Sequence, residues 1–206
     1  MNVNALAYLI SKKIMNYTPT SEVAGAKDNP IIELAHQMTF IEDGTPHDYT
    51  DEIPWCSSWM NLVTLLGCMC VDPIKVVATL NRKKFAPYVL KEFYALFIQA
   101  VYPDIQTKIA GSFEAVMPTF DASAISWAKW GIPVEYKDAI EGDMVVLSRK
   151  GGNHITFLAE SKLDMTKEFF IGLGGNQADK VCLAPQATAR IIAVRRAPLL
   201  MPPPKT

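Results

Sequence analysis

The sequence predicts a single α+β domain, with helices in its first half and a meander of short strands in its second half. Up to about residue 110 the apolar residues recur at helical spacing, and after Gly111 they alternate with polar residues as in β-strands. Of the 206 residues, 50% are hydrophobic and 20% are charged, which is typical of a folded globular protein and unlike a disordered chain. We therefore expect residues 1–206 to form one domain.

Charge and hydropathy argue against two classes of partner. The net charge of -1 argues against sequence-independent binding of nucleic acid, which depends on a basic surface. The most apolar run, Trp59–Val71, is shorter than the roughly 20 residues that cross a bilayer, so no membrane span is expected. The apolar stretch Ala5–Ile10 has its lysines after it rather than before it. We therefore expect synthesis in the cytoplasm without a signal peptide.

Helical periodicity predicts four segments in the first half of the chain. One covers Ala5–Met15, and a second begins at Pro30, where proline suits the first turn of a helix. A polar loop over residues 42–54 leads into a third helix from about Cys56. Residues 73–110 are helical again, with an apolar stripe in the part after Ala86.

The second half contains the predicted strands. The segment ISWAKWGIP indicates a short aromatic helix that ends at Gly131 and Pro133. Alternating residues then predict five strands, near 143–148, 154–160, 168–173, 180–183 and 190–195. The tail, about residues 198–206, is proline-rich and is expected to be flexible.

The helical segment at about residues 71–114 is open to two interpretations. Its stripe predicts burial of Phe93, Leu96, Phe97 and Val101, and the basic cluster Arg82–Lys84 is expected to be solvated. The segment is then either a packing elaboration or a surface that selects substrate or docks a partner.

Cys56 is the first candidate for chemistry. It lies where a polar loop enters an apolar helix, and the unpaired N–H groups of a first helical turn favour a thiolate. Trp55 and Trp59 flank it and are placed to shape a cleft, although a buried structural cysteine is equally consistent with this position. Without a CxxC pair no metal site is expected, and the other cysteines (Cys68, Cys70 and Cys182) are predicted to be buried and inert.

His154 and an amide-bearing turn are the second and third candidates. His154 begins a strand after a Gly-Gly turn, and Asn176 and Gln177 follow the end of another strand. A histidine base needs a polar group to hold its ring, and an amide oxygen is suitable. The alternatives are a structural histidine and an ordinary hairpin turn.

A cysteine on an early helix, a histidine on a later strand and a polar residue on the next strand is the order found in papain-like thiol hydrolases. The sequence resembles the NlpC/P60 and CHAP superfamily of cell-wall hydrolases, in particular a phage-associated and secreted subfamily. Five motifs carry the resemblance: Pro54-Trp55-Cys56, SWAKWG from Ser126, GDMVV from Gly142, Asn153-His154-Ile155 and LGGNQ from Leu173. The position before the histidine is commonly glycine in this family and is Asn153 here.

The resemblance implies a papain-like NlpC/P60 fold, in which the cysteine helix packs on a five-stranded, mostly antiparallel sheet. It implies a peptidoglycan amidase or endopeptidase with Cys56 as nucleophile, His154 as base and no metal or cofactor. Asn176 would orient the ring of His154, and Gln177 is the second candidate for this role. Trp55, Trp59 and Gln177 would contact substrate.

The resemblance also implies a setting. The protein would act in the periplasm or cell wall, either as a bacteriolytic phage endolysin released through a membrane pore or as an injected antibacterial effector. In either case the segment 71–114 could contact delivery machinery or an immunity protein. Two alternatives remain: a catalytically inactive papain-like binding module, and a thiol peptidase or transferase that acts on protein.

Overall fold

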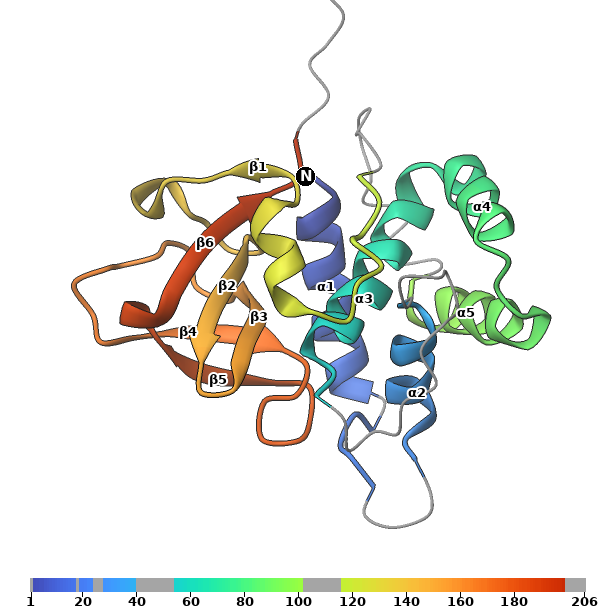
Figure 1. The fold of residues 1–206 in the computed structure, drawn as a ribbon, viewed down its shortest axis with the longest axis horizontal. Coiled ribbons are helices and arrows are strands. Elements are labelled where there is room, and N and C mark those ends of the chain that lie inside the picture. Colours follow the sequence, from blue (N-terminus) through green and yellow to red (C-terminus); the bar gives the residue numbers. More distant parts are fainter. Residues whose placement is uncertain (1, 18, 24–27, 40–53, 102–115, 199–206) are drawn as a thin grey trace, which may run out of the picture.

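The computed structural model describes residues 2–17, 19–23, 28–39, 54–101 and 116–198, and it has the predicted α+β architecture (Figure 1). The α-helices are α1 (Val3–Tyr17), α2 (Pro30–Gln37), α3 (Cys56–Val71), α4 (Pro73–Arg82) and α5 (Pro87–Ala100). The strands are β1 (Ile132–Pro133), β2 (Met144–Arg149), β3 (Gly152–Leu158), β4 (Phe169–Gly174), β5 (Cys182–Ala187) and β6 (Ile191–Arg196). Short 3-10 helices are η2 (Ala124–Lys129), η3 (Tyr136–Asp138) and η4 (Thr188–Arg190). Most of the predicted loop 42–54, the end of the segment 71–114 and the tail after residue 198 lie outside the described residues.

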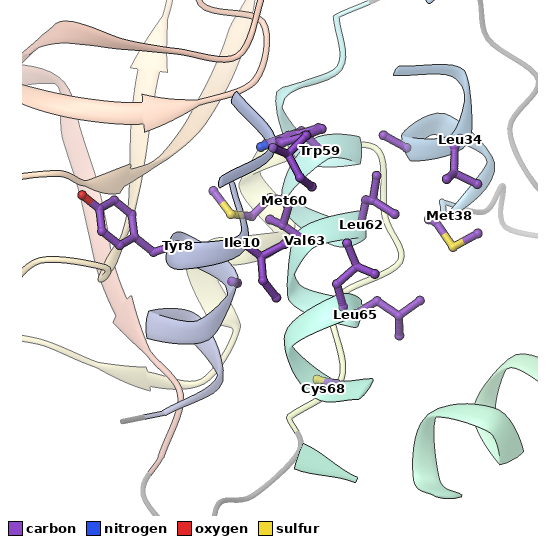
Figure 2. Packing of buried hydrophobic residues seen from close by; sticks show 14 of the residues in the cluster. Tyr8, Ile10, Leu34, Met38, Trp59, Met60, Leu62, Val63, Leu65 and Cys68 are labelled. Atoms are coloured by element: carbon purple, nitrogen blue, oxygen red, sulfur yellow. The ribbon is translucent and has the colours of Figure 1, made fainter. Parts of the chain in front are cut away.

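Helix α3 is the centre of the molecule. Together with α1 it lies against the sheet, while α2, α4 and α5 lie on its other side (Figure 1). Figure 2 shows side chains of α1, such as Ile10, and of α2, such as Leu34, approaching α3 from opposite sides. The first 13 residues of α3 are buried. This burial explains why the α3 sequence is apolar around most of its circumference rather than on one stripe.

The helix starts follow local sequence signals except at α3. Asn29 caps α2 by accepting a hydrogen bond from the Ile31 backbone N–H at 3.0 Å, and Asp72 caps α4 through the Lys75 backbone N–H at 2.9 Å. By contrast, α3 follows Trp55, and no side chain among the described residues caps it. The N–H groups of its first turn are therefore left for other partners.

The described residues form an open, antiparallel six-stranded sheet in the order β1-β6-β2-β3-β4-β5. The prediction of five strands was wrong by one, because Ile132 and Pro133 pair with Arg196 and Arg195 instead of only ending a helix. Two residues are too few to show an alternating pattern, so only the pairing reveals this strand. The last two predicted strands also begin one or two residues later than expected, and β5 extends to Ala187.

The pairing of β3 with β4 is partial and leaves room for the cysteine helix. The two strands pair only through Phe157 with Leu173 and Leu158 with Gly172. The half of β3 that carries His154 and Ile155 pairs with β2 on one side and is not paired with β4 on the other. The start of α3 packs against β3 and β4.

The segment 71–114 packs mainly as predicted within its described part. Phe93, Leu96 and Val101 are buried, but Phe97 is only partly buried, so the prediction for Phe97 was wrong. Phe97 lies on the flank of the α5 stripe, where spacing alone does not separate a core position from a boundary position. In the basic cluster, Lys83 is partly buried with its Nζ 4.5 Å from the centre of the Phe120 ring. None of the described helices is long and apolar enough to cross a membrane.

Candidate functional site

The ring of His154 is held by Gln177. The side chain of His154 is 4% exposed, and its Nε2 lies 3.1 Å from Oε1 of Gln177. The Gln177 amide nitrogen donates to the carbonyl oxygens of Gly172 at 3.1 Å and Cys182 at 2.5 Å. Because that nitrogen must be the donor, the oxygen faces the imidazole, and Nε2 must carry the ring hydrogen.

This tautomer leaves Nδ1 of His154 as a bare acceptor. Nδ1 is buried and has no hydrogen-bond partner among the described residues. A buried acceptor without a partner is costly and is a common mark of a functional group. Burial lowers the pKa of His154 to about 4, the hydrogen bond that the ring donates to Gln177 opposes this shift, and the charge of Arg149 adds to it. The imidazole is thus neutral near pH 7 and able to accept a proton.

Cys56 is the first residue of α3 and lies beside the same strand. Its side chain is 4% exposed, and burial raises the pKa of its thiol. Hydrogen bonding from the backbone N–H of Ile155, the residue after His154, and the charge of Arg149 both lower that pKa. The balance contradicts the expected low-pKa thiolate, because desolvation outweighs the first-turn N–H groups. The resting pair is a neutral thiol and a neutral imidazole.

The residue that orients His154 is Gln177 and not Asn176, so the first choice made from sequence was wrong. Asn176 has a φ of 54°, in the left-handed region, and lies partly exposed on the wall of a cavity. The sharp turn at Asn176 directs the next side chain back over β4, where its amide meets the ring.

Trp55 and Trp59 are both 0% exposed and do not reach the described surface. Nε1 of Trp55 donates to Glu22 at 2.7 Å, and Nε1 of Trp59 donates to Ser11 at 2.9 Å. A Cβ at Gly175 would lie 2.5 Å from the Trp55 ring, so this glycine lets the end of β4 approach the start of α3. The structure gives the tryptophans a packing role in place of the predicted substrate contact.

Polar residues inside α3 position its first turn, and sequence reasoning missed them. Ser57 donates to the Asp121 carbonyl at 2.6 Å and accepts from Nε1 of Trp127 at 2.9 Å. Asn61 accepts from the backbone N–H of Phe120 at 2.6 Å. The signal was present as isolated polar residues in an otherwise apolar helix. The aromatic motif from Ser126 therefore anchors the Cys56 end of α3.

The GDMVV motif also has a structural role, through Asp143. Asp143 is buried, and Arg196 binds its carboxylate with both Nε and Nη2, at 2.7 and 2.6 Å. This bidentate pair joins the beginning of β2 to the end of β6.

The other cysteines differ in burial but share a raised thiol pKa. Cys68 is buried as predicted, whereas Cys70 and Cys182 are only partly buried, so that part of the prediction was wrong. Burial raises the pKa of all three, that of Cys70 to about 12. Each thiol donates to a backbone carbonyl, and none lies in the contacts of His154. The described residues contain no cluster of ligands that could hold a metal ion.

A cavity of about 360 Å³ opens beside His154 and Gln177. It extends over the end of β2 at Arg149, over β5 at Gln186 and to Arg190 in η4. His154 lines this cavity, whereas Cys56 does not.

Lowering the pH should destabilise the protein through His154. Its pKa of about 4 in the folded protein is below the ordinary 6.5, so the unfolded chain binds more protons between these values. Above about pH 6.5 the histidine therefore does not reduce the free energy of unfolding. As the pH is lowered to 4, the free energy of unfolding falls by on the order of 3 kcal/mol. Urea denaturation across this range should show a smaller loss for His154→Gln than for wild type. Parallel curves for the two proteins would contradict the assigned burial.

Comparison of the chain with family models, with curated proteins and with solved structures gives no significant match. The motif resemblance therefore stays a prediction.

Proposed function

We propose that this protein is a cysteine hydrolase that cleaves amide bonds by acyl transfer. The observation that carries the proposal is the imidazole of His154. Gln177 accepts a hydrogen bond from Nε2 of this ring, and Nδ1 is buried without a partner among the described residues. Cys56 accepts a hydrogen bond from the backbone of Ile155, the residue after His154. A neutral base with one fixed nitrogen and one open nitrogen is the arrangement that activates a nearby thiol.

The first half of the reaction forms a thioester. Nδ1 of His154 takes the proton from Sγ of Cys56 as the sulfur attacks the substrate carbonyl carbon. The negative charge on the carbonyl oxygen is stabilised by the first-turn N–H groups of α3, beginning with that of Cys56, which no capping side chain among the described residues occupies. The carbon–nitrogen bond then breaks, and His154 gives its proton to the leaving amine.

The second half releases the acid product. His154 takes a proton from water, the resulting hydroxide attacks the thioester carbon, and the carbon–sulfur bond breaks. The thiolate of Cys56 recovers the proton from His154, which restores the neutral pair. Gln177 accepts the Nε2 hydrogen bond throughout, so the ring keeps its orientation in both halves.

The substrate we propose is bacterial peptidoglycan, and this part rests on the five motifs. The bond is an amide within the peptide stem or between the stem and the sugar. Action on peptidoglycan places the protein in the periplasm or cell wall, after release during phage lysis or after injection into a competing cell.

The direct test is incubation of the purified protein with peptidoglycan sacculi, followed by mass spectrometry of the soluble fragments. New amino and carboxyl termini, absent with Cys56→Ala, support the proposal and identify the bond. Binding to sacculi without fragments would indicate an inactive binding module. Cleavage or transfer on protein substrates alone would indicate a protein-directed thiol enzyme.

Gln177→Ala should reduce kcat by roughly 100-fold or more, since general acid–base catalysis supplies factors of this size and needs an oriented ring. It should also lower the pKa of His154 further, because the hydrogen bond that Gln177 accepts from the ring raises that pKa. The pKa is measured by NMR titration of the ring.

Asn176→Gly is the matched control, because glycine keeps the positive φ and removes the neighbouring amide. It should leave the pKa of His154 unchanged. An equal shift of the pKa in both variants would remove Gln177 from the positioning role.

A further inference from the structure

The cavity beside His154 has the composition of an anion site. Among the described residues that line it are two arginines, Arg149 and Arg190, and no Asp or Glu. Arg149 is partly buried and Arg190 is exposed. In the part of the chain that the structure describes, neither guanidinium has an ion pair or a side-chain hydrogen bond. Two unpaired guanidinium groups around one cavity favour a planar anion, which each can bind through two parallel hydrogen bonds.

The position of the cavity connects it to the chemistry. His154 and Gln177 form part of its wall, so a group bound there lies against the imidazole. Arg149 lines the cavity together with His154, and its positive charge lowers the pKa of both Cys56 and His154. The volume of about 360 Å³ is within the range of small-ligand pockets and exceeds what a single carboxylate fills. The remaining space can hold the part of the substrate that carries the anion.

We propose that this cavity is a substrate subsite that binds a carboxylate next to the scissile amide, through Arg149 and Arg190. The inference rests on the proposed hydrolase function and deepens it, because it names a carboxylate-bearing peptide as the substrate class. A carboxylate can accept charge-assisted hydrogen bonds from both guanidinium groups, whereas a primary amide is neutral and has only one accepting atom, so the amide form should bind more weakly.

The test uses two ligands and a catalytically silent protein. One ligand is an N-acetylmuramoyl peptide with free carboxylates, and the other is the same peptide with every carboxylate converted to a primary amide. Binding of each to Cys56→Ala is measured by calorimetry. We expect the carboxylate form to bind at least about 10-fold more tightly, as is typical for a charge-assisted hydrogen bond.

Three further variants show which residues cause the preference for the carboxylate peptide. Adding Arg190→Gln to Cys56→Ala should remove most of the preference for the carboxylate peptide. Because Arg190 is exposed, this substitution should leave the melting temperature unchanged. Lys150→Gln is the matched control, because Lys150 is exposed next to Arg149 and does not line the cavity. Equal affinity for the two peptides, no binding of either, or a preference that survives in Arg149→Gln/Arg190→Gln would overturn the proposal.

Hydrolysis by the unmodified protein separates this proposal from the one on which it rests. If both peptides are cleaved with the same kcat/KM, the carboxylate subsite is wrong and the hydrolase stands. If neither is cleaved but Cys56→Ala keeps its preference, the subsite stands and acyl transfer through Cys56 is wrong. If the carboxylate peptide is cleaved with the lower KM, and Arg190→Gln raises that KM, both stand.

Discussion

Replacing Cys56 by alanine is expected to lower peptidoglycan hydrolysis by about 10⁴-fold or more, since loss of a nucleophile removes the covalent route entirely. The fold should survive. Cys56 contributes only one sulfur atom at the first residue of α3, and the helix keeps its anchors through Ser57 and Asn61. The truncation should cost about 1 kcal/mol, the usual size for a single substitution. The activity is measured on sacculi, and the fold by circular dichroism.

The matched control is Cys70→Ala, at the opposite end of the same helix. Cys70 is partly buried and its thiol donates to the Leu66 carbonyl at 3.3 Å, away from His154. This variant should retain wild-type hydrolysis. A well-folded Cys56→Ala protein that still cleaves sacculi would rule out the thiol mechanism.

Phe93→Ala is expected to lower the free energy of unfolding by about 3–5 kcal/mol. Phe93 lies on α5, is 0% exposed and packs edge-to-face on Tyr94, with 5.6 Å between ring centres. Removing its ring leaves a cavity among the helices beyond α3, and domains of ordinary stability have only about 5–15 kcal/mol in total. Urea denaturation followed by circular dichroism gives the loss directly.

Phe97→Ala is the control on the same helix, because Phe97 is only partly buried. It should cost clearly less than Phe93→Ala, since less apolar surface returns to water. If Phe97→Ala proves the more damaging, α5 is rotated from its position in the structure. If it leaves stability unchanged but prevents lysis of cell walls, this flank of α5 is a docking surface.

Local signals were enough to predict the helices and most strands. Prolines at first-turn positions with Asn29 and Asp72 before them mark the starts of α2 and α4, because these residues satisfy N–H groups within the same segment. The mostly apolar residues of β2 and β3 reflect burial on both faces of one hairpin. The placement of Cys56 at a helix start and of His154 on a strand also followed from local sequence.

The amino-acid sequence by itself therefore determined which segments are helix or strand and which few residues carry reactive groups, because these properties depend on neighbours within a few positions. Only the tertiary structure decided that Gln177 rather than Asn176 meets His154, that β1 pairs with β6, and that Trp55 and Trp59 are buried. Each of these depends on contacts between residues far apart in the chain. The contacts arise from the strand register, from the positive φ of Asn176 and from the close packing of Gly175 on the Trp55 ring. None of these features produces a periodic pattern in the sequence.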